Sequence, residues 1–285
     1  MRVLLTGATG FVGSSVLRAL VAGGHEVTAV VRSQAGADTV TTAGATAVIH
    51  PLPDTEWLAK QLRETDGFIH TATPDDGTAA TFDDSVIDAV LDGYAGTQKR
   101  YVHSGGVWVH GPGDDITEDT PIRAPEITAW RQEREARVLA AGFVGSVVEP
   151  AVVYGYGKGI PTEITGAPKT KEGALLLVGG GDQHWTTVHV DDLADLYVKV
   201  LEEAPGGERY IGANGDNPTV REIGLAAVGP DGLVAAEDPA ASFARLGEPY
   251  ARALALDQQT AGQKARLTFG WAPSRPSLIE ELRAR

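Results

Sequence analysis

The sequence predicts an α/β protein built on a doubly wound parallel sheet, with a smaller C-terminal lobe. Three observations support this fold class. A glycine-rich turn, TGATGFVG, joins the first apolar run to the first helical pattern. Apolar runs then alternate with helical patterns as far as Val153, and beyond it glycine and proline become frequent. Continuous apolar strands that alternate with helices are typical of a parallel sheet covered on both faces.

The first element is a strand over Arg2–Thr6, a short apolar run that ends at the glycines of the turn. The helix after it, SSVLRALVAG, has apolar residues at helical spacing and closes at Gly23 and Gly24. The later strands are short apolar runs, and the segments between them have patterns typical of helices. The expected strands are Glu26–Val31, Ala47–His50, Phe68–Thr71, Arg100–His103 and Ser146–Val153, and the expected helices are Ala35–Ala43, Thr55–Arg63, Asp83–Leu91 and one within Glu126–Ala141.

The chain after Val153 predicts a different organisation. One clear helix lies in VHVDDLADLYVKVLE, with Asp191 or Asp192 as its N-cap. We therefore expect residues 1–153 to form the sheet domain, with residues 186–203 packed back onto it. Residues 154–185 and 204–285 then form the smaller lobe, which would contribute the substrate pocket. A doubly wound sheet binds its ligand beyond the carboxyl ends of its strands.

Composition narrows the class of protein. The 285 residues are 42% hydrophobic and 22% charged, and the formal charge is −14. This charge argues against nucleic acid or an anionic membrane as partner. It says nothing about a small-molecule substrate, which we expect as the partner, and a homodimer is left open. The absence of cysteine excludes disulfides and thiolate catalysis. Because no apolar stretch reaches the ~18 residues of a membrane span, and no secretory signal is recognisable, we expect a cytoplasmic protein.

The glycine turn predicts a dinucleotide site of the Rossmann type. Gly7, Gly10 and Gly13 are spaced by three residues between a strand and a helix. Gly7 permits the tight turn, Gly10 lets the backbone approach a pyrophosphate, and Gly13 lets helix and strand pack closely. The amino end of the helix offers unpaired N–H groups to the phosphates. Further cofactor contacts are expected from neighbouring turn residues: Thr9, Phe11 and Val12.

The end of the second strand indicates which dinucleotide binds. A site for NAD usually has an acidic residue about 20 positions after the turn, which holds the ribose 2′-hydroxyl. Here Val31 takes that place, and Arg32 and Ser33 follow it. An arginine can bind a 2′-phosphate through two parallel charged hydrogen bonds. The sequence therefore favours NADP (NADPH) as cofactor, with NAD the less favoured alternative.

Together these motifs resemble the short-chain dehydrogenase/reductase superfamily, in particular its extended, NAD-dependent epimerase/dehydratase-like members. The matching segments are TGATGFVG, FIHTAT, YVHSGGVW, VVEPAVVYG, VHVDDLADLY and RLTFGWAPSRPSLIEEL, which span nearly the whole chain. The resemblance implies that Thr71, Ala72 and Thr73 lie along the ribose and phosphates of the cofactor. It also implies that Ser104, four residues before Trp108, takes the position of the family's substrate-polarising serine.

One part of the family pattern is missing. In the family, a tyrosine on the helix after the fifth strand donates a proton to the substrate oxygen, and a lysine one turn later lowers its pKa and holds the nicotinamide ribose. The corresponding helix here, EITAWRQEREARVLAAG, contains neither residue. The tyrosine position falls on Ile127, Thr128 or Trp130, and the lysine position on Arg131, Gln132 or Arg134. We take Arg131 as the residue that keeps the ribose contact.

Tyr154 and Lys158, in VVYGYGKGI, reproduce the tyrosine–lysine spacing elsewhere in the chain. Three interleaved glycines make a helix improbable there. Without a helix the spacing does not couple the two side chains, so we predict that this pair is not the catalytic pair. Tyr154 or Tyr156 is still able to face the site individually.

Three functions fit these observations. The first is an NADP-dependent reductase of a carbonyl, imine or activated double bond in a small apolar metabolite. Its proton would come from Ser104, His110, Tyr154 or Tyr156, and His110 is attractive because a histidine pKa of about 6.5 suits proton transfer. The second is an isomerase or lyase with a structural dinucleotide, and the third is a catalytically silent redox sensor. We favour the first.

The remaining histidines and tryptophans favour structural roles. His70 and His103 lie in apolar runs and are expected to be packed in the core. His184 and His189 flank WTTV without an acidic cluster at metal-ligand spacing, so no metal site is predicted. Trp108 and Trp130 are expected to pack, with either able to line an apolar pocket.

Overall fold

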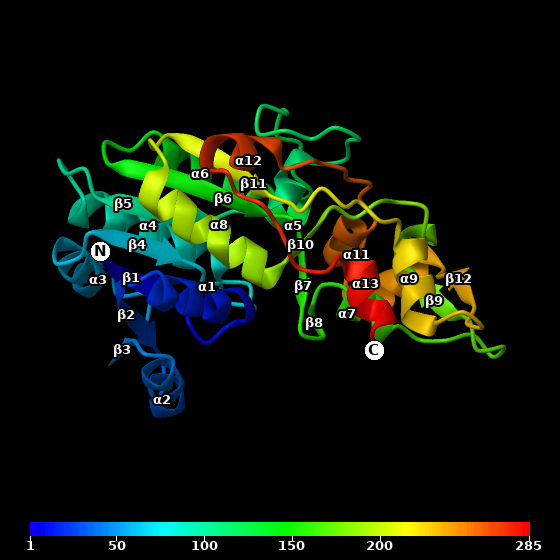
Figure 1. The fold of residues 1–285 in the computed structure, drawn as a ribbon. Coiled ribbons are helices and arrows are strands. Elements are labelled where there is room, and N and C mark those ends of the chain that lie inside the picture. The colour runs from blue at the N-terminus through cyan, green and yellow to red at the C-terminus, as the bar shows by residue number, and fades with distance from the viewer.

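The computed structural model describes residues 1–285 and contains one seven-stranded, fully parallel sheet in the order β11-β6-β5-β4-β1-β2-β3 (Figure 1). Its strands are β1 Arg2–Thr6, β2 Glu26–Val31, β3 Thr46–Ile49, β4 Gly67–His70, β5 Arg100–Ser104, β6 Val144–Pro150 and β11 Glu208–Gly212. The predicted fold class, an α/β protein with a doubly wound parallel Rossmann sheet, is confirmed. β11 adds a seventh strand to the six that were expected.

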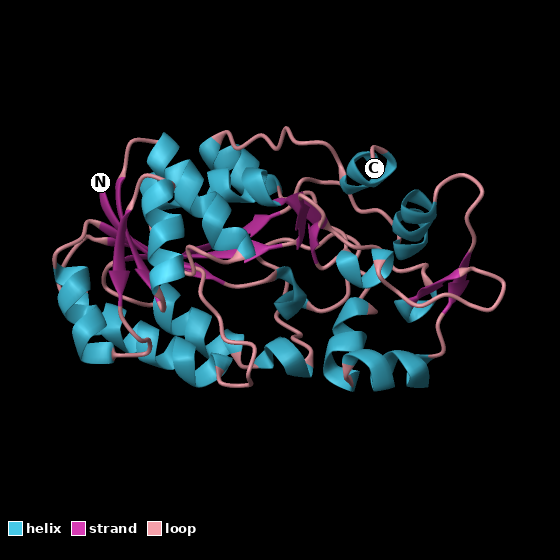
Figure 2. Ribbon diagram, turned by 90° about the horizontal axis from the view of Figure 1, so that it is seen from below, coloured by secondary structure: helices cyan, strands magenta, loops and turns pink.

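Helices cover both faces of this sheet, as Figure 2 shows from a second direction. One face packs on a core cluster that includes Leu17, Val40, Leu196 and Phe269, and the other on a cluster that includes Val86. The helices of the first face are α1 Phe11–Ala22, α2 Gln34–Thr42, α8 Val190–Glu203 and α12 Gln263–Phe269. Those of the second face are α3 Thr55–Arg63, α4 Ala79–Gly93 and α6 Arg131–Leu139.

The order of the strands determines where a ligand can bind. From β1 the chain proceeds outward through β2 and β3, then crosses back to β4 and proceeds the other way through β5 and β6. The strand order therefore reverses between β1 and β4. In open α/β sheets the ligand crevice lies outside the carboxyl ends of the strands at such a reversal. The glycine turn follows β1 at this point.

The expected strand Ser146–Val153 is two strands, so that prediction needs correction. β6 ends at Pro150, and β7 (Val152–Gly155) pairs with β10 (Thr187–His189) and with β8 (Lys158–Gly159). The chain changes partner at Ala151, whose N–H still bonds to β11, whereas the next N–H bonds to Thr186. Pro150 has no N–H to donate, which weakens the ladder where the chain leaves the sheet.

The remaining elements surround a third core cluster, which includes Tyr154, Trp185 and Leu254. They are the strand pair β9 Leu175–Leu177 and β12 Val234–Ala236, the helices α5 Glu126–Ala129, α7 Thr162–Thr165, α9 Val220–Val228, α10 Pro239–Leu246, α11 Glu248–Leu254 and α13 Leu278–Arg283, and the 3₁₀ turns η1 Val107–His110 and η2 Val178–Gly180. Most of them lie on the right in Figure 1, beyond the sheet. The expected domain boundaries stay a prediction.

The N-cap of α8 differs from the expected one. His189 caps this helix, because its Nδ1 accepts the backbone N–H of Asp191 at 3.1 Å. Asp192 instead accepts the backbone N–H groups of Ser274 and Arg275 at 3.0 and 3.1 Å. Its carboxylate thus attaches the C-terminal segment to α8, a long-range role that a local capping pattern does not reveal.

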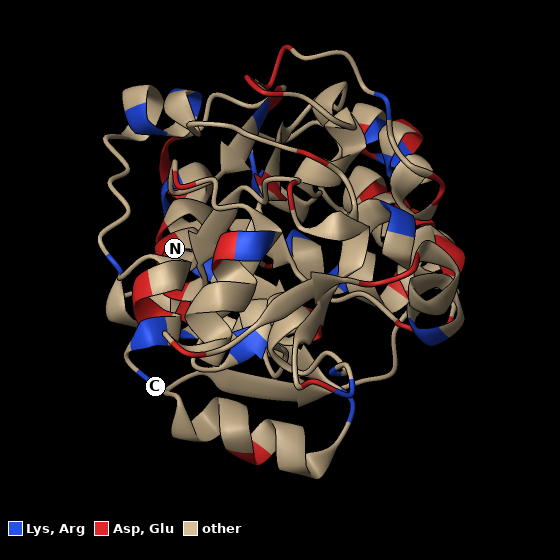
Figure 3. Ribbon diagram, turned by 90° about the vertical axis from the view of Figure 1, so that its right-hand side faces the viewer, with Lys and Arg blue, Asp and Glu red and all other residues tan.

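The outer helices carry acidic and basic residues side by side (Figure 3). None of the helices combines the length and the apolar character that crossing a bilayer requires.

The packing of α1 on β1 gives a first testable prediction. A Cβ at Gly13 would lie 2.1 Å from the Gly7 carbonyl oxygen and 2.6 Å from Thr71 Oγ1. We expect Gly13→Ala to lower the free energy of unfolding by about 1–3 kcal/mol, because helix and strand must move apart. Denaturant unfolding measures the change. Gly142→Ala is the control, since a Cβ there meets nothing within 4 Å; equal losses in the two variants would contradict the prediction.

Candidate functional site

The glycine turn is packed against the end of β4. Gly7 has a φ of +80°, and a Cβ on it would lie 2.6 Å from Thr71 Oγ1 and 2.7 Å from the Ala72 nitrogen. Thr71 Oγ1 donates a hydrogen bond to the carbonyl of Thr6 at 2.8 Å, so its side chain closes the turn from the side of β4. Ala72 is half-buried behind it and Thr73 is exposed. The turn is therefore a compact backbone cradle that any side chain at Gly7 would fill.

The amino end of α1 is left open. Its N-cap, Gly10, has no side chain to accept a first-turn N–H, and the first turn contains no acidic residue. The first N–H groups of a helix have no partner within the helix and need one from outside. A cleft of about 390 Å³ adjoins this end and is lined by Thr9, Gly10, Phe11, Ser14, Ser15, Arg18, Tyr156 and Lys158. Unpaired N–H groups beside a cleft fit a phosphate-bearing ligand such as a dinucleotide.

The predicted cofactor residues after β2 lie at the carboxyl edge of the sheet. Val31 is buried, whereas Arg32 and Ser33 are exposed. Ser33 Oγ accepts the Gly36 N–H at 3.3 Å and so caps α2. The Ser33 hydroxyl thus has a structural use, and the Arg32 guanidinium is the group at this strand end that is available to a ligand.

Ser104, Tyr197 and Arg131 meet at the end of β5. Ser104 Oγ donates to the His70 carbonyl at 2.6 Å and accepts the hydroxyl hydrogen of Tyr197 at 2.7 Å. Arg131 Nη1 donates to the Ser104 carbonyl at 2.9 Å, and its guanidinium lies 4.4 Å from the centre of the Trp130 ring. Burial raises the pKa of Tyr197 to about 12, so its hydroxyl keeps its proton. Tyr197 was not identified from the sequence, where it is one apolar-face position of α8.

The structure distinguishes the three residues considered for the lysine position. Arg134 bonds to the Ala80 carbonyl and to Asp84, and so joins α6 to α4. Gln132 is exposed. Only Arg131 reaches the end of β5. One helical turn before it lies Ile127, a half-buried hydrocarbon side chain without a proton to donate.

Two of the expected proton donors are enclosed, which corrects the expectation that they face the site. His110 is 0% exposed, with Nε2 2.8 Å from Glu149 and Nδ1 3.1 Å from the Thr120 carbonyl. Burial alone would lower the pKa of His110, but bonding to Glu149 outweighs it and the pKa is raised. Tyr154 is 1% exposed and donates its hydroxyl to the Pro276 carbonyl at 2.7 Å.

The spacing of Tyr154 and Lys158 does not belong to a helix, as predicted. The two residues lie on strands β7 and β8 of a hairpin, where Tyr154 pairs with Gly159 and Gly155 pairs with Lys158. Tyr156, at the turn between them, is exposed and donates its hydroxyl to Asp191.

A buried ion network lies behind the end of β5. Arg209 Nη1 lies 2.6 Å from Glu149 Oε1 and 3.0 Å from Glu135 Oε2, and Glu149 also holds His110. The second oxygen of Glu135 has no partner, and a Cβ on Gly105 would lie 2.7 Å from it. Burial, with the nearby charge of Glu149, raises the pKa of Glu135 to about 7. In the sequence, the sign of this network is a single acid, Glu149, inside the apolar run SVVEPAVV.

The other histidines serve structural roles. His70 and His103 are buried, as expected, and both approach Asp83 of α4, at 3.2 and 3.4 Å. Burial lowers the pKa of His103 to about 3, so its ring is neutral. His184 pairs with Asp257 at 2.9 Å. Trp108 packs against two of the core clusters and Trp130 supports the Arg131 guanidinium.

Comparison with known proteins identifies relatives over the whole length. The model of the NAD dependent epimerase/dehydratase family matches residues 3–212. An uncharacterised protein of Schizosaccharomyces pombe is 30% identical over 298 residues, which cover 99% of this chain and 98% of the relative. A 4-hydroxy-2-methyl-3-oxo-4-farnesyl-3,4-dihydroquinoline-1-oxide ketoreductase of Stigmatella aurantiaca is 28% identical over 278 residues, covering 89% and 82%. A 3-diazoavenalumate denitrifying reductase of Streptomyces is 27% identical over 311 residues, covering 97% of each.

Solved structures share the fold at lower identity. A human epimerase family protein with NADPH has a TM-score of 0.78 at 22% identity, covering 100% of this chain and 98% of that one. A UDP-glucose 4-epimerase of Thermus thermophilus in complex with NAD has a TM-score of 0.74 at 21% identity, covering 99% and 97%.

The buried network predicts a pH dependence of stability. Because the pKa of Glu135 is raised from 4.5 to about 7, the folded protein holds a proton that the unfolded chain releases. The free energy of unfolding should therefore fall as pH rises from about 5 to 7, by up to ~1.4 kcal/mol per unit. The raised pKa of His110 acts in the same direction, but only as pH rises above its ordinary value of 6.5.

Glu135→Gln should flatten this fall, and denaturant unfolding at several pH values measures it. Glu133→Gln, at an exposed position of the same helix, is the control and should retain the wild-type slope. If wild type and Glu135→Gln gave parallel curves, Glu135 would not titrate in this range.

Proposed function

The chain belongs to the NAD dependent epimerase/dehydratase family, and on this premise we propose that it is an NADP-dependent oxidoreductase with an atypical site. Its substrate is a carbonyl, imine or activated double bond in a small apolar metabolite. The observation that carries the proposal is the glycine cradle at the amino end of α1, which faces a cleft of about 390 Å³. The amides of the turn are the phosphate donors, with Thr9, Phe11, Val12 and Thr73 beside them.

The names of the relatives favour a redox reaction. The relatives from Stigmatella aurantiaca and Streptomyces are called a ketoreductase and a denitrifying reductase, and both align along most of their length. A reduction is therefore the reaction type that we propose for this chain, ahead of an isomerisation or an elimination.

Arg32 supports NADP as the cofactor. It is exposed at the end of β2 and no acidic side chain takes the place of Val31. Solved relatives of this fold contain NADPH in one case and NAD in another, so the choice depends on this strand end. A guanidinium binds a 2′-phosphate with two parallel hydrogen bonds, whereas an acid there would repel it.

The residues at the end of β5 indicate how a hydride transfer would be assisted. A bound nicotinamide supplies a hydride to the substrate. Arg131 keeps a positive charge next to Ser104. In place of the family's lysine, it would hold the nicotinamide ribose. Ile127, one turn earlier, supplies no proton. An acceptor that is cationic or conjugated needs little acid assistance, because negative charge on a single oxygen does not develop fully.

Ser104 is the remaining proton donor at this position. Its hydroxyl gives its hydrogen to the His70 carbonyl and receives one from Tyr197. If Ser104 turned its hydrogen toward a substrate oxygen, it would donate a hydrogen bond to that oxygen, while Tyr197 kept its own proton and continued to donate to Ser104 Oγ. His110 and Tyr154 are enclosed and are not part of this proposal.

Cofactor preference is the direct test of Arg32. Wild type should bind NADPH at least about tenfold more tightly than NADH, and Arg32→Glu should erase or reverse this preference. Titration of the reduced nicotinamide fluorescence gives the dissociation constants. Lys60→Glu makes the same change of charge at an exposed position of α3 and should keep the preference. Equal affinity for both cofactors before and after the change would exclude the assigned role of Arg32.

The reaction type is tested in single turnovers with a panel of carbonyls and imines. We expect the absorbance of the NADPH nicotinamide band to fall as substrate is reduced. Product formed without any change in this band would instead indicate an isomerase or lyase. No reaction, together with tight cofactor binding and a captured partner protein, would indicate a redox sensor.

A further inference from the structure

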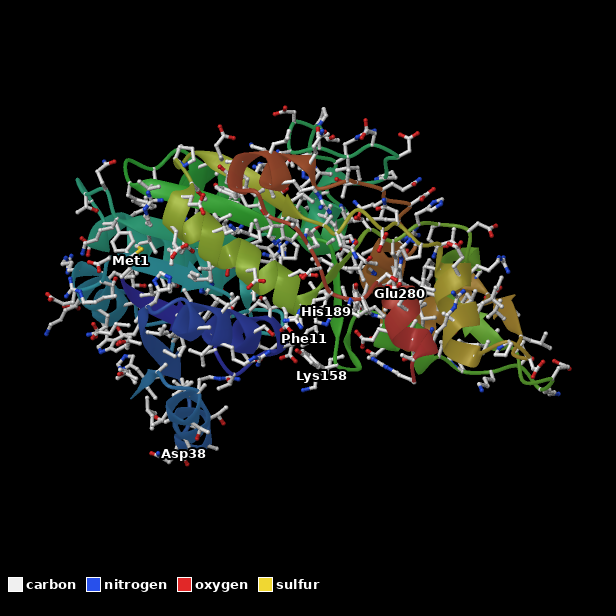
Figure 4. The ribbon with its side chains drawn as sticks, viewed as in Figure 1. Met1, Phe11, Asp38, Lys158, His189 and Glu280 are labelled. Carbon is white, nitrogen blue, oxygen red and sulfur yellow. The ribbon has the colours of Figure 1, made fainter.

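The cleft beside α1 has two walls from different parts of the chain. One is the glycine turn and the first turns of α1, and the other is the β7–β8 hairpin, which contributes Tyr156 and Lys158. Figure 4 shows Lys158 on this hairpin close to Phe11 of α1. The hairpin does not belong to the seven-stranded sheet. A ligand in the cleft would therefore contact both the sheet domain and the segment that follows β6.

Charge distinguishes Lys158 from its neighbours. The only cations that line the cleft are Arg18 and Lys158. Arg18 is paired with Asp191 at 3.3 Å, and Asp191 also contacts Arg275 at 3.4 Å and accepts the Tyr156 hydroxyl. Lys158 is exposed and pairs with no carboxylate. In a protein of net charge −14, this ammonium is an unneutralised positive charge next to the open end of a helix.

The hairpin is fixed in its place. Gly159 has a φ of +92°, and a Cβ on it would lie 3.0 Å from a ring carbon of Phe11. The Gly157 N–H donates to Glu281 of α13 at 3.3 Å, and Tyr154 donates to the Pro276 carbonyl at 2.7 Å. The hairpin is thus held between α1 and the C-terminal segment, and the cleft-lining position of Lys158 does not depend on a loop closing.

We propose that Lys158 binds the diphosphate of the nicotinamide dinucleotide, opposite the amides of the glycine turn. This inference rests on the proposed function, since it requires that a dinucleotide occupies the cleft. The turn supplies neutral N–H donors, and a lysine adds a point charge that offsets one of the two phosphate charges. The diphosphate is common to NADP and NAD, so Lys158 should act on both alike, unlike Arg32.

The test compares four proteins: wild type, Lys158→Gln, Lys158→Arg and Lys171→Gln. Lys171 is an exposed lysine that does not line the cleft, so its change is the matched control. Affinities for NADPH and NADH are measured by titration calorimetry, and melting temperatures of the nucleotide-free proteins report the fold. We expect Lys158→Gln to weaken both nucleotides by about tenfold, and the other two variants to bind like wild type.

The outcomes separate this inference from the proposed function. If wild type bound neither nucleotide, the proposed function itself would fail. If wild type bound them and Lys158→Gln bound equally well, Lys158 would have no part in the diphosphate site. A loss confined to NADPH would also overturn the inference, because it would place Lys158 at the 2′-phosphate. A similar loss of affinity in Lys171→Gln would show that the effect comes from net charge alone, and it would also overturn the inference.

Discussion

The close approach of α1 to the carboxyl end of β1 is the constraint on which the rest of the structure depends. A Cβ at Gly13 would overlap the Gly7 carbonyl, and a Cβ at Gly7 would overlap Thr71. Because no side chain separates helix and strand, the first-turn amides of α1 come to the reversal point of the strand order. The same placement brings Phe11 against Gly159, so one backbone contact positions both walls of the cleft.

The candidate site combines the glycine turn with a second group of residues at the end of β5. There Arg131 supplies a positive charge beside the hydroxyls of Ser104 and Tyr197. Arg131, which we propose in place of the family's lysine, donates to the backbone carbonyl of Ser104. Behind it, two buried acids share Arg209. Such a network is costly to bury and is stable only while its partners are complete. It joins β6, β11, α6 and η1 next to the site, and its two acids and His110 are buried away from a ligand.

The sequence alone was sufficient for the parallel sheet, the glycine turn and the family, because each depends on local patterns: apolar runs, glycine spacing and short motifs. The departure of the chain from the sheet at Ala151 was missed, since VVEPAVVY reads as one apolar run. The enclosure of His110 and Tyr154 depends on partners far away in sequence, namely Glu149 and Pro276. The His189 cap is local, but histidine is not among the usual N-cap residues. In the sequence, Lys158 stands out only for its spacing from Tyr154. Its position in the cleft depends on how the β7–β8 hairpin packs beside α1, which the sequence does not reveal.

The central claim is that a nicotinamide dinucleotide lies in the cleft between the amino end of α1 and the β7–β8 hairpin. A crystal structure of the protein with NADPH at saturating concentration tests it most directly. The diphosphate should lie against the amides of residues 11–13, within reach of the Lys158 ammonium, with the 2′-phosphate next to Arg32. A nucleotide bound elsewhere, or a cleft that stays empty under these conditions, would contradict the claim.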